Sequence, residues 1–363
     1  MPIYMDYHIF DDVTAEQVKQ AHLIDKKTQD KYKVKYHQFW VNEKAGTVFC
    51  LIEGPNAEAC EKVHREAHGN VACNIIEVEA GAMELFMGKT HSVNQGVVYN
   101  GNGKIDPGFR YLMAIDIVGK TDVLNHDDIR KLTIPETQRK YTRNLIQLFD
   151  GEEVKNLSDD GIIAVFTDVN KALECAVKIQ SGFLTRIKRG EWDIEFRIGL
   201  SDGQPVTMKD GFFEDAIDFS KHLSLISADG EITMSNNIKK LSNFNNICGA
   251  NEQLKIVSDR QRDFAENFFK HTQTHLANSN FSIISLSAEL GVSRAQLYRK
   301  TIALTGRSPV NFIRDIKMNK ARNLIKRERL NISEIALEVG YNNPSYFSKC
   351  FQERFGIVPS RML

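Results

Sequence analysis

Two segments near the C-terminal end repeat one pattern, in which two short amphipathic helices are separated by a tight turn. The first reads SLSAELGVSRAQLYRKTIAL with Gly291 at the turn, and the second, about 49 residues later, reads ISEIALEVGYNNPSYFSKCFQERFG with Gly340 at the turn. The apolar positions of the two copies are Leu286, Leu290, Val292, Leu297 and Ile302, then Ile335, Ala336, Val339, Phe347 and Phe351. One copy is also typical of a plain helical bundle, but two copies favour an all-α double helix-turn-helix domain.

The net charge of zero conceals an uneven distribution along the chain. From Arg262 to the end there are 16 Lys and Arg residues against 8 Asp and Glu residues, so this part carries +8 and the rest of the chain carries −8. A basic domain on an acidic body suits a polyanion such as double-stranded DNA, although a basic surface also serves solubility.

Further motifs lie between and after the two copies. They are LYRK at 297–300, TGRSP at 305–309, FIR at 312–314, AR at 321–322, IA at 335–336, GY at 340–341, SYFS at 345–348, FG at 355–356 and PS at 359–360. On these motifs, residues 261–361 resemble the AraC family of bacterial transcription regulators. The resemblance implies two helix-turn-helix units joined by a long helix over about 309–328, and DNA as the partner.

In each unit the second helix should present polar side chains to base edges while its apolar face packs on the domain. The positions predicted to face DNA are Arg294, Ala295, Tyr298 and Arg299 in the first unit and Asn343, Ser345, Tyr346 and Lys349 in the second. Tyr346 also suits a core position. Four other basic residues are interpreted as phosphate contacts or solvated charges, namely Lys300, Arg307, Arg314 and Arg354.

Length and composition limit the class of protein. A chain of 363 residues is long enough for two or three domains, and no apolar run approaches the 18 or more residues that span a bilayer. The N-terminus lacks a basic leader followed by an apolar stretch, and the six cysteines form no CxxC pair. We therefore expect a cytoplasmic protein without membrane contact. A Gly-rich stretch at 99–108 predicts a linker, and the predicted domains are 1–98, 108–241 and 258–363.

The middle block alternates apolar strands (111–117, 162–166, 196–200) with helical patterns and predicts an α/β domain. Its strings AIDIVGKTDVL, KNLSDDGIIAVF, FRIGLSDG and GEITMS resemble class III nucleotidyl cyclases. The resemblance implies divalent metal at Asp116 and Asp160, whose carboxylates would serve a triphosphate.

The middle block departs from the cyclase pattern at the catalytic positions. Asp218 and His222, in DAIDFSKHL, stand where the family has Asn and Arg, so neither the amide nor the guanidinium that would stabilise developing charge is present. We therefore expect a cyclase-like domain without catalytic residues, used for dimerisation or nucleotide sensing. Whether it binds nucleotide stays open, as does an unrelated α/β fold.

The N-terminal block alternates strands and helices in the order βαββαβ, which predicts an α+β ferredoxin-like domain. The predicted strands are 3–9, 34–41, 47–52 and 74–78, and the predicted helices are 15–31 and 57–68. The strings MDYH, KYKVKYHQFWVNEKAGTVFCLIEGP and VHREAHG resemble a family of small nickel-binding ferredoxin-like proteins.

Several histidines of this block could share a metal. His64 and His68 are four residues apart on one helix face, and His8 closes the first strand, which ends at the same edge of the sheet as that helix. With His22 or a carboxylate completing the set, Ni²⁺, Zn²⁺ and Cu²⁺ all suit such donors, and only the resemblance favours nickel. Asp25, His37 and Glu53 are further donors. The alternative is a helix end with two solvated histidines.

These features together predict a one-component regulator, a homodimer in which a metal or small-ligand sensor and a cyclase-like module control a DNA-binding domain. The alternatives are an active nucleotidyl cyclase fused to a DNA-binding domain and a metal-storage protein. The sequence leaves open the operator, the target genes, the direction of regulation and the effector.

Overall fold

The computed structural model describes residues 1–88, 92–119, 136–154, 161–209, 211–249, 253–327 and 329–362. Its Cα positions cluster into two compact units. The first holds residues 1–111 with the short segments 165–167 and 202–218, and the second holds the remaining residues. Among the described residues, no helix combines the length and the apolar character that crossing a bilayer requires.

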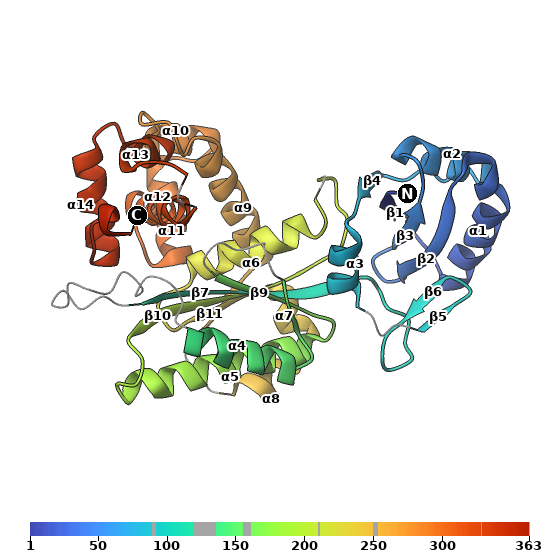
Figure 1. Ribbon diagram of the computed structural model, residues 1–363, viewed down its shortest axis with the longest axis horizontal. Coiled ribbons are helices and arrows are strands. Elements are labelled where there is room, and N and C mark those ends of the chain that lie inside the picture. Colours follow the sequence, from blue (N-terminus) through green and yellow to red (C-terminus); the bar gives the residue numbers. More distant parts are fainter. Residues whose placement is uncertain are drawn as a thin grey trace. The chain divides into compact units, whose positions relative to one another are not determined.

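The first unit is built on a sheet with the strand order β4-β1-β3-β2 and two helices, α1 and α2 (Figure 1). Its elements are β1 Ile3–Ile9, α1 Ala15–Thr28, β2 Lys35–Asn42, β3 Thr47–Glu53, α2 Ala57–Ala67 and β4 Asn74–Glu77. This order confirms the predicted ferredoxin-like domain. The first helix ends at Thr28, and a 3₁₀ turn over Gln29–Tyr32 continues the chain to β2.

A short hairpin extends this sheet beside β2, and a helix follows β4. The hairpin consists of β5 Ser92–Asn94 and β6 Val97–Tyr99, and the helix is α3 Ala80–Met87. After the hairpin, Arg110 and Asp106 form a fully buried ion pair of 2.9 Å, and the Arg110 Nε donates to the Phe86 carbonyl at 2.6 Å. The stretch predicted as an open linker is therefore packed at its C-terminal end.

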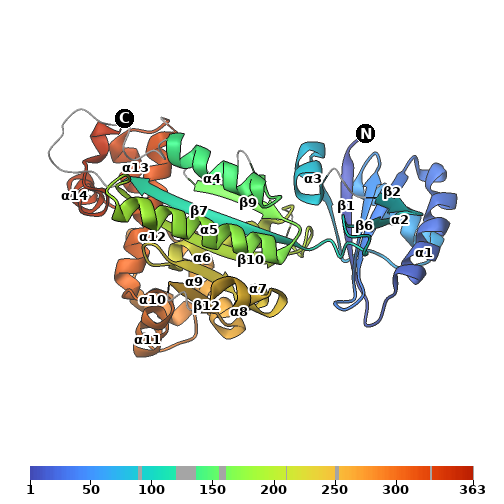
Figure 2. The same cartoon turned by 90° about the horizontal axis from the view of Figure 1, so that it is seen from below.

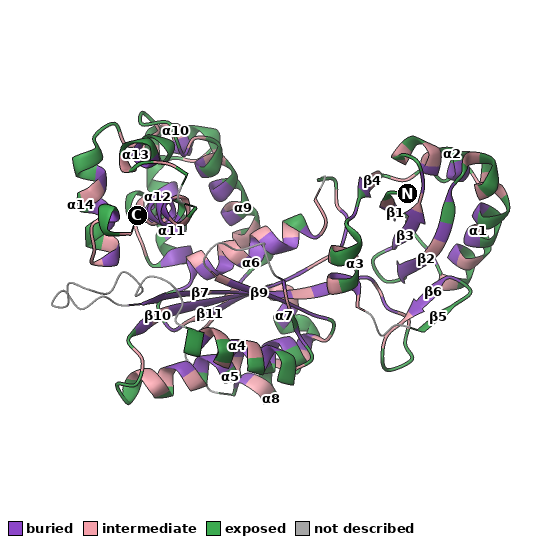
Figure 3. Ribbon diagram, in the orientation of Figure 1, coloured by how far each residue is buried: buried purple, intermediate pink, exposed green. Residues whose placement is uncertain are grey.

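The middle of the chain forms a second six-stranded sheet of order β12-β11-β10-β7-β9-β8, which agrees with the predicted α/β domain. Its strands are β7 Arg110–Gly119, β8 Glu152–Glu153, β9 Gly161–Phe166, β10 Ile194–Gly203, β11 Ile232–Ser235 and β12 Leu254–Val257. Its helices are α4 Glu136–Leu148, α5 Val169–Lys188, α6 Glu214–Ile226, α7 Asn236–Leu241 and α8 Phe244–Cys248. Helices α4 and α5 cover one face of the sheet, and α6 lies on the other (Figures 1 and 2). The central strands are almost wholly buried (Figure 3).

The C-terminal part is all helical and contains two helix-turn-helix units, which confirms the predicted class. Its helices are α9 Asp259–Thr274, α10 Ile283–Glu289, α11 Arg294–Thr305, α12 Pro309–Lys326, α13 Ile332–Glu338 and α14 Pro344–Phe355. The units are α10–α11 and α13–α14, and α12 joins them, ending two residues earlier than predicted. A Ser308 N-cap and Pro309 in the first turn fix where α12 begins.

The two turn glycines serve different needs. Both adopt left-handed backbone angles, with φ of +61° at Gly291 and +73° at Gly340. A Cβ on Gly291 would meet no atom within 4 Å, whereas a Cβ on Gly340 would lie 2.5 Å from the Leu276 carbonyl oxygen and 2.7 Å from the Lys317 Nζ. Gly291 is therefore required for its conformation alone, and Gly340 also for space.

This difference makes a prediction about stability. Gly291→Ala should cost about 1–2 kcal/mol of unfolding free energy, the strain of a left-handed Ala. Gly340→Ala should cost about 1–3 kcal/mol more, because the methyl group must also displace a backbone carbonyl. Urea denaturation of the two variants, followed by far-UV circular dichroism, measures both values. Equal losses would contradict the packing argument.

Candidate metal centre and nucleic-acid interface

Three elements of the ferredoxin-like domain bring ionisable side chains together in its interior. Asp6 and His8 are two residues apart on β1 and so lie on one face of the sheet. His64 lies in the last turn of α2, and α1 supplies Asp25. Asp6, His8, His64 and Asp25 are at most 4% exposed, so the sequence has placed a charged cluster inside the domain.

His64 lies at the centre of this cluster, between two carboxylates. Its Nε2 is 2.6 Å from the Asp6 Oδ2, and its Nδ1 is 3.2 Å from the Asp25 Oδ1. His8 Nε2 is 3.2 Å from the same Asp6 oxygen, and His68 Nε2 is 3.1 Å from the same Asp25 oxygen. The five side chains thus form one continuous chain of close polar contacts.

The neighbours of each group set its charge. Burial would by itself raise the pKa of Asp6, but the charges and hydrogen bonds of His8 and His64 hold that pKa well below its ordinary value. Burial would lower the pKa of His64, yet hydrogen bonds to Asp25 and Asp6 raise that pKa to about 10. Two buried carboxylates therefore face one positively charged imidazole, and each depends on the others for charge compensation.

A cavity of about 270 Å³ opens beside the cluster and is lined by His8, His22, Asp25, His64 and His68, among others. His22 is 2% exposed, and neither of its ring nitrogens has a hydrogen-bond partner among the described residues. Burial lowers the pKa of His22 to about 4, so its imidazole is neutral near pH 7. Unpartnered, neutral imidazole nitrogens and compensated carboxylates are the donor set that divalent transition metals prefer.

Within the part of the chain that the structure describes, ligand atoms close enough to share one ion occur in two groups that overlap at His64. They are Asp6, His8, Cys50 and His64, and Asp25, His64 and His68, with the ligand atoms of each group within 4.8 Å of one another. Of the four predicted metal ligands, His8, His64 and His68 are therefore brought together, and His22 lines the cavity outside both groups.

The two groups include three donors that were not among the four predicted metal ligands. Asp6 and Cys50 were missed, although the i, i+2 spacing of Asp6 and His8 on one strand is a signal that could have found the first. Asp25 was noted only as a further donor. His37 and Glu53 form a separate pair, 3.2 Å apart and partly exposed, and they do not line the cavity.

The second candidate site is the outer surface of α11 and α14. All the residues predicted to face DNA are exposed, namely Arg294, Ala295, Tyr298, Arg299, Asn343, Ser345, Tyr346 and Lys349. Leu297, Phe347 and Phe351 hold the opposite faces and are fully buried (Figure 3). Tyr346, which suited either position, is 56% exposed. Ile302 departs from the apolar pattern, because it is 45% exposed.

Local hydrogen bonds fix where both helices start. Ser293 and Gln296 form a capping box at α11. Asn343 accepts hydrogen bonds from the backbone N–H groups of Ser345 and Tyr346 at 2.9 and 3.1 Å, so its side-chain oxygen caps α14. The first turn of each helix is thereby held open to solvent at a defined position.

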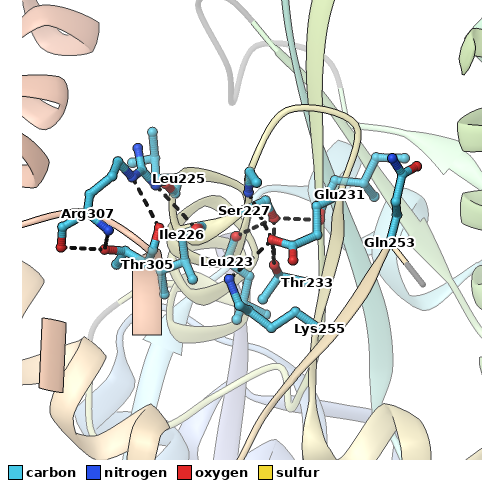
Figure 4. Close-up of polar contacts among 12 residues, drawn as sticks. Leu223, Leu225, Ile226, Ser227, Glu231, Thr233, Gln253, Lys255, Thr305 and Arg307 are labelled. Carbon is cyan, nitrogen blue, oxygen red and sulfur yellow. Dashed lines mark hydrogen bonds and ion pairs between the residues drawn. The ribbon is translucent and has the colours of Figure 1, made fainter. Parts of the chain in front are cut away.

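Two of the four basic residues interpreted as phosphate contacts or solvated charges have another role. Arg307 donates to the carbonyl oxygens of Leu225 and Ile226 at 2.5 and 3.2 Å (Figure 4). Its other Nη pairs with Asp315 at 2.8 Å. Arg354 lies 3.3 Å from Glu195 on β10. Both interpretations were wrong, because these guanidinium groups are bound to other parts of the protein.

The residues singled out by the cyclase resemblance lie in different surroundings. The Asp116 carboxylate, on β7, accepts a hydrogen bond from Arg322 at 3.0 Å. His222, on α6, stacks on Phe269 with ring centroids 3.8 Å apart, and Asp218 lies one turn earlier on the same helix. Asp160 lies outside the described residues.

Two protein-family models match parts of the chain. Residues 4–78 match the family described as "Nickel responsive protein SCO4226-like". Residues 286–363 match the family described as "Helix-turn-helix domain". The first range contains every predicted metal ligand, and the second contains both helices with the predicted DNA-facing residues.

Similar curated proteins share only part of their length with this chain. Histidine kinase P4 of Formosa agariphila is 34% identical over 128 residues, which is 35% of this chain and 9% of that protein. The HTH-type transcriptional regulator CdhR of Pseudomonas aeruginosa is 30% identical over 92 residues, 25% of this chain and 26% of that protein. The matched part of this chain thus spans about a tenth of the first relative and about a quarter of the second.

Solved structures also resemble parts of the chain. SCO4226 of Streptomyces coelicolor is 39% identical, with 21% of this chain and 94% of that chain covered and a TM-score of 0.20. An adenylate/guanylate cyclase/hydrolase of Silicibacter pomeroyi is 27% identical, with 36% and 78% covered and a TM-score of 0.30.

Family matches, helix arrangement and the motifs of the C-terminal part agree with one another. The chain carries an SCO4226-like domain at its N-terminal end and a helix-turn-helix domain of the AraC type at its C-terminal end.

Proposed function

We propose that the protein is a sequence-specific transcription regulator that binds double-stranded DNA through α11 and α14. The observation that carries this proposal is the division of each helix into a buried apolar face and an exposed face. The exposed faces bear seven of the eight predicted DNA-facing residues, and the eighth, Asn343, is the exposed N-cap of α14. The surrounding domain has an excess of eight positive charges. Such a surface attracts phosphate and presents side chains to the major groove.

The effector in this proposal is a divalent transition metal, Ni²⁺ in first place, held at the cluster around His64. The match to a nickel-responsive family favours nickel, and the nitrogen and oxygen donors also suit Zn²⁺. Asp6 and Asp25 would supply negative charge, and His8, His64 and His68 would supply nitrogens. His64 would release its proton to the solvent on binding, because the ion would take over the charge compensation of the two carboxylates. His22 would approach from the cavity. A bound ion would tie α1 and α2 to β1, because its ligands come from all three elements.

The DNA-binding proposal predicts the effect of one side chain. Arg299→Ala should weaken binding to a selected operator by about 1–3 kcal/mol, because a long basic side chain in the major groove donates to base edges. Fluorescence anisotropy with a duplex selected from a random library by the wild-type protein measures this loss.

The control is Arg189→Ala, which removes an equal charge from the exposed end of α5 and should leave binding unchanged. An equal loss for Arg299→Ala on selected and random duplexes would make Arg299 a phosphate contact instead.

We also propose that the protein binds its operator as the homodimer that the sequence predicts. Sedimentation of the operator complex should then show two chains per operator, and one chain would refute the homodimer.

The metal proposal predicts which histidines matter for affinity. In the full chain, His68→Ala and His64→Ala should each weaken Ni²⁺ binding by at least about 10-fold, since even an outer partner of a metal ligand is worth 10–100-fold. Isothermal titration calorimetry with Ni²⁺ and Zn²⁺ measures the affinities. His68 is 12% exposed, so its variant disturbs the domain less than that of the buried His64.

The matched control is His37→Ala, which removes an imidazole of the same domain that lies outside the cavity. Its Ni²⁺ affinity should equal that of the wild type. Unchanged stoichiometry and affinity in both His68→Ala and His64→Ala, with native circular dichroism spectra, would remove this site from the proposal.

A further inference from the structure

The carboxylate that the cyclase resemblance assigns to a metal has a guanidinium as its partner. Arg322, on α12, is 3% exposed, and its Nη2 lies 3.0 Å from the Asp116 Oδ1. The Asp116 side chain is 13% exposed. Burial alone would raise the pKa of Asp116, but the charges of Arg322 and Arg197 outweigh burial and lower that pKa. Asp116 is therefore ionised and already compensated by cations of the chain itself.

Two more arginines of the helical part reach the same side of the α/β domain. Arg354, near the end of α14, lies 3.3 Å from Glu195 on β10. Arg307, just before α12, donates to the two carbonyl groups near the C-terminal end of α6 (Figure 4). Those carbonyls belong to the last turn of a helix, where acceptors lack partners within the helix and attract cations. Arg322, Arg354 and Arg307 thus contact β7, β10 and α6, respectively.

Apolar packing continues between these polar contacts. Phe219, Leu223 and Ile226 of α6 share one core cluster with residues of the first helix-turn-helix unit, and Val118 of β7 belongs to the cluster of the second. From the helical part, the first cluster contains Phe268, Phe269, Leu304, Phe312 and Ile316, and the second contains Met318, Ala321, Ile325, Phe351 and Phe355. Each helix-turn-helix unit therefore has its own apolar contact with the α/β domain.

These contacts do not fit a divalent ion at Asp116. An ion there would lie beside the Arg322 guanidinium and within the field of Arg197 and Arg354, which act on the same carboxylate. Like charges at such distances repel strongly where water is scarce. At the position of the family's catalytic Arg, His222 is stacked on Phe269 of α9.

We propose that this face of the α/β domain is a docking platform for the DNA-binding domain, with Asp116 as the positioning residue that anchors the linking helix through Arg322. Docking holds both helix-turn-helix units in one orientation while α11 and α14 stay exposed for simultaneous contact with two turns of DNA. The simultaneous contact with DNA rests on the proposed DNA-binding function. The docking of the helical part on the α/β domain concerns the chain alone.

The test is a double-mutant cycle on Asp116 and Arg322. Asp116→Asn and Arg322→Gln each leave one buried charge without its partner, whereas the double variant replaces the ion pair by two neutral amides. Each single variant should weaken binding to a duplex with both contact sites by at least about 10-fold, because only the docked fraction binds with both units. Binding to a duplex long enough for one unit should change less than about 2-fold.

The loss of DNA affinity in the double variant should be smaller than the product of the two single losses. If Asp116 were a metal ligand that acts independently of Arg322, the two losses would multiply. Glu153→Gln is the matched control, because Glu153 is also 13% exposed and pairs with Arg143 in the same domain. Its DNA affinity should equal that of the wild type. Multiplicative losses in the cycle, or equal losses on the long and short duplexes, would overturn the proposal.

A measurement without DNA separates this proposal from the proposed function. Hydrogen–deuterium exchange of the free protein should show faster exchange of α12 in Asp116→Asn than in the wild type. In the double variant the exchange rate of α12 should return toward that of the wild type. If exchange changes in this way but the protein binds none of the duplexes tested, the proposed DNA-binding function is refuted and the proposed docking is supported. Unchanged exchange, or Mn²⁺ binding that Asp116→Asn abolishes, would refute docking at Asp116.

Discussion

The packing of α12 is the constraint on which the DNA-binding half of the molecule depends. Phe312 and Ile316 at its start belong to the core of the first helix-turn-helix unit, and Met318 and Ile325 belong to that of the second. One rigid helix thus contributes to two cores, so the separation of α11 and α14 follows from its length. The exposed faces of both helices are a consequence of how their opposite faces are buried against this helix.

The ferredoxin-like domain obeys a different constraint, the compensation of charge in its interior. Asp6 and Asp25 are buried on either side of His64, and the removal of His64 would leave both carboxylates without the partner that they share. Such a cluster contributes little to stability compared with apolar packing of equal volume. Its presence beside a cavity is therefore better explained by ligand binding than by folding.

Local patterns and chain topology predicted much of this arrangement. Strict alternation and helical periodicity gave the βαββαβ order and the two helix-turn-helix units, since each element buries one face. Topology also indicated that His8 and His64 meet, although they are 56 residues apart in sequence. The sequence did not reveal the packing of Asp106 with Arg110, because Asn and Gly around them suggested an open segment.

Long-range partners of charged residues were beyond the reach of sequence patterns. Arg307 and Arg354 carry the same signal as residues that contact phosphate, and only the fold shows that they contact α6 and β10. Arg322 was noted as part of a family motif, but nothing in the motif shows that its partner is Asp116, 206 residues earlier. The sequence shows where a charged residue occurs, but the partner of that charge depends on the tertiary structure.

We propose that metal binding at the N-terminal domain alters DNA binding by the C-terminal domain. The most direct test of this proposal is a reciprocal titration, in which the Kd for operator DNA is measured with and without saturating Ni²⁺, and the Kd for Ni²⁺ with and without saturating operator. Linkage requires the two ratios to be equal, and coupling between such sites is typically about 5–150-fold. We expect equal ratios within this range. Ratios of one in both titrations would contradict it.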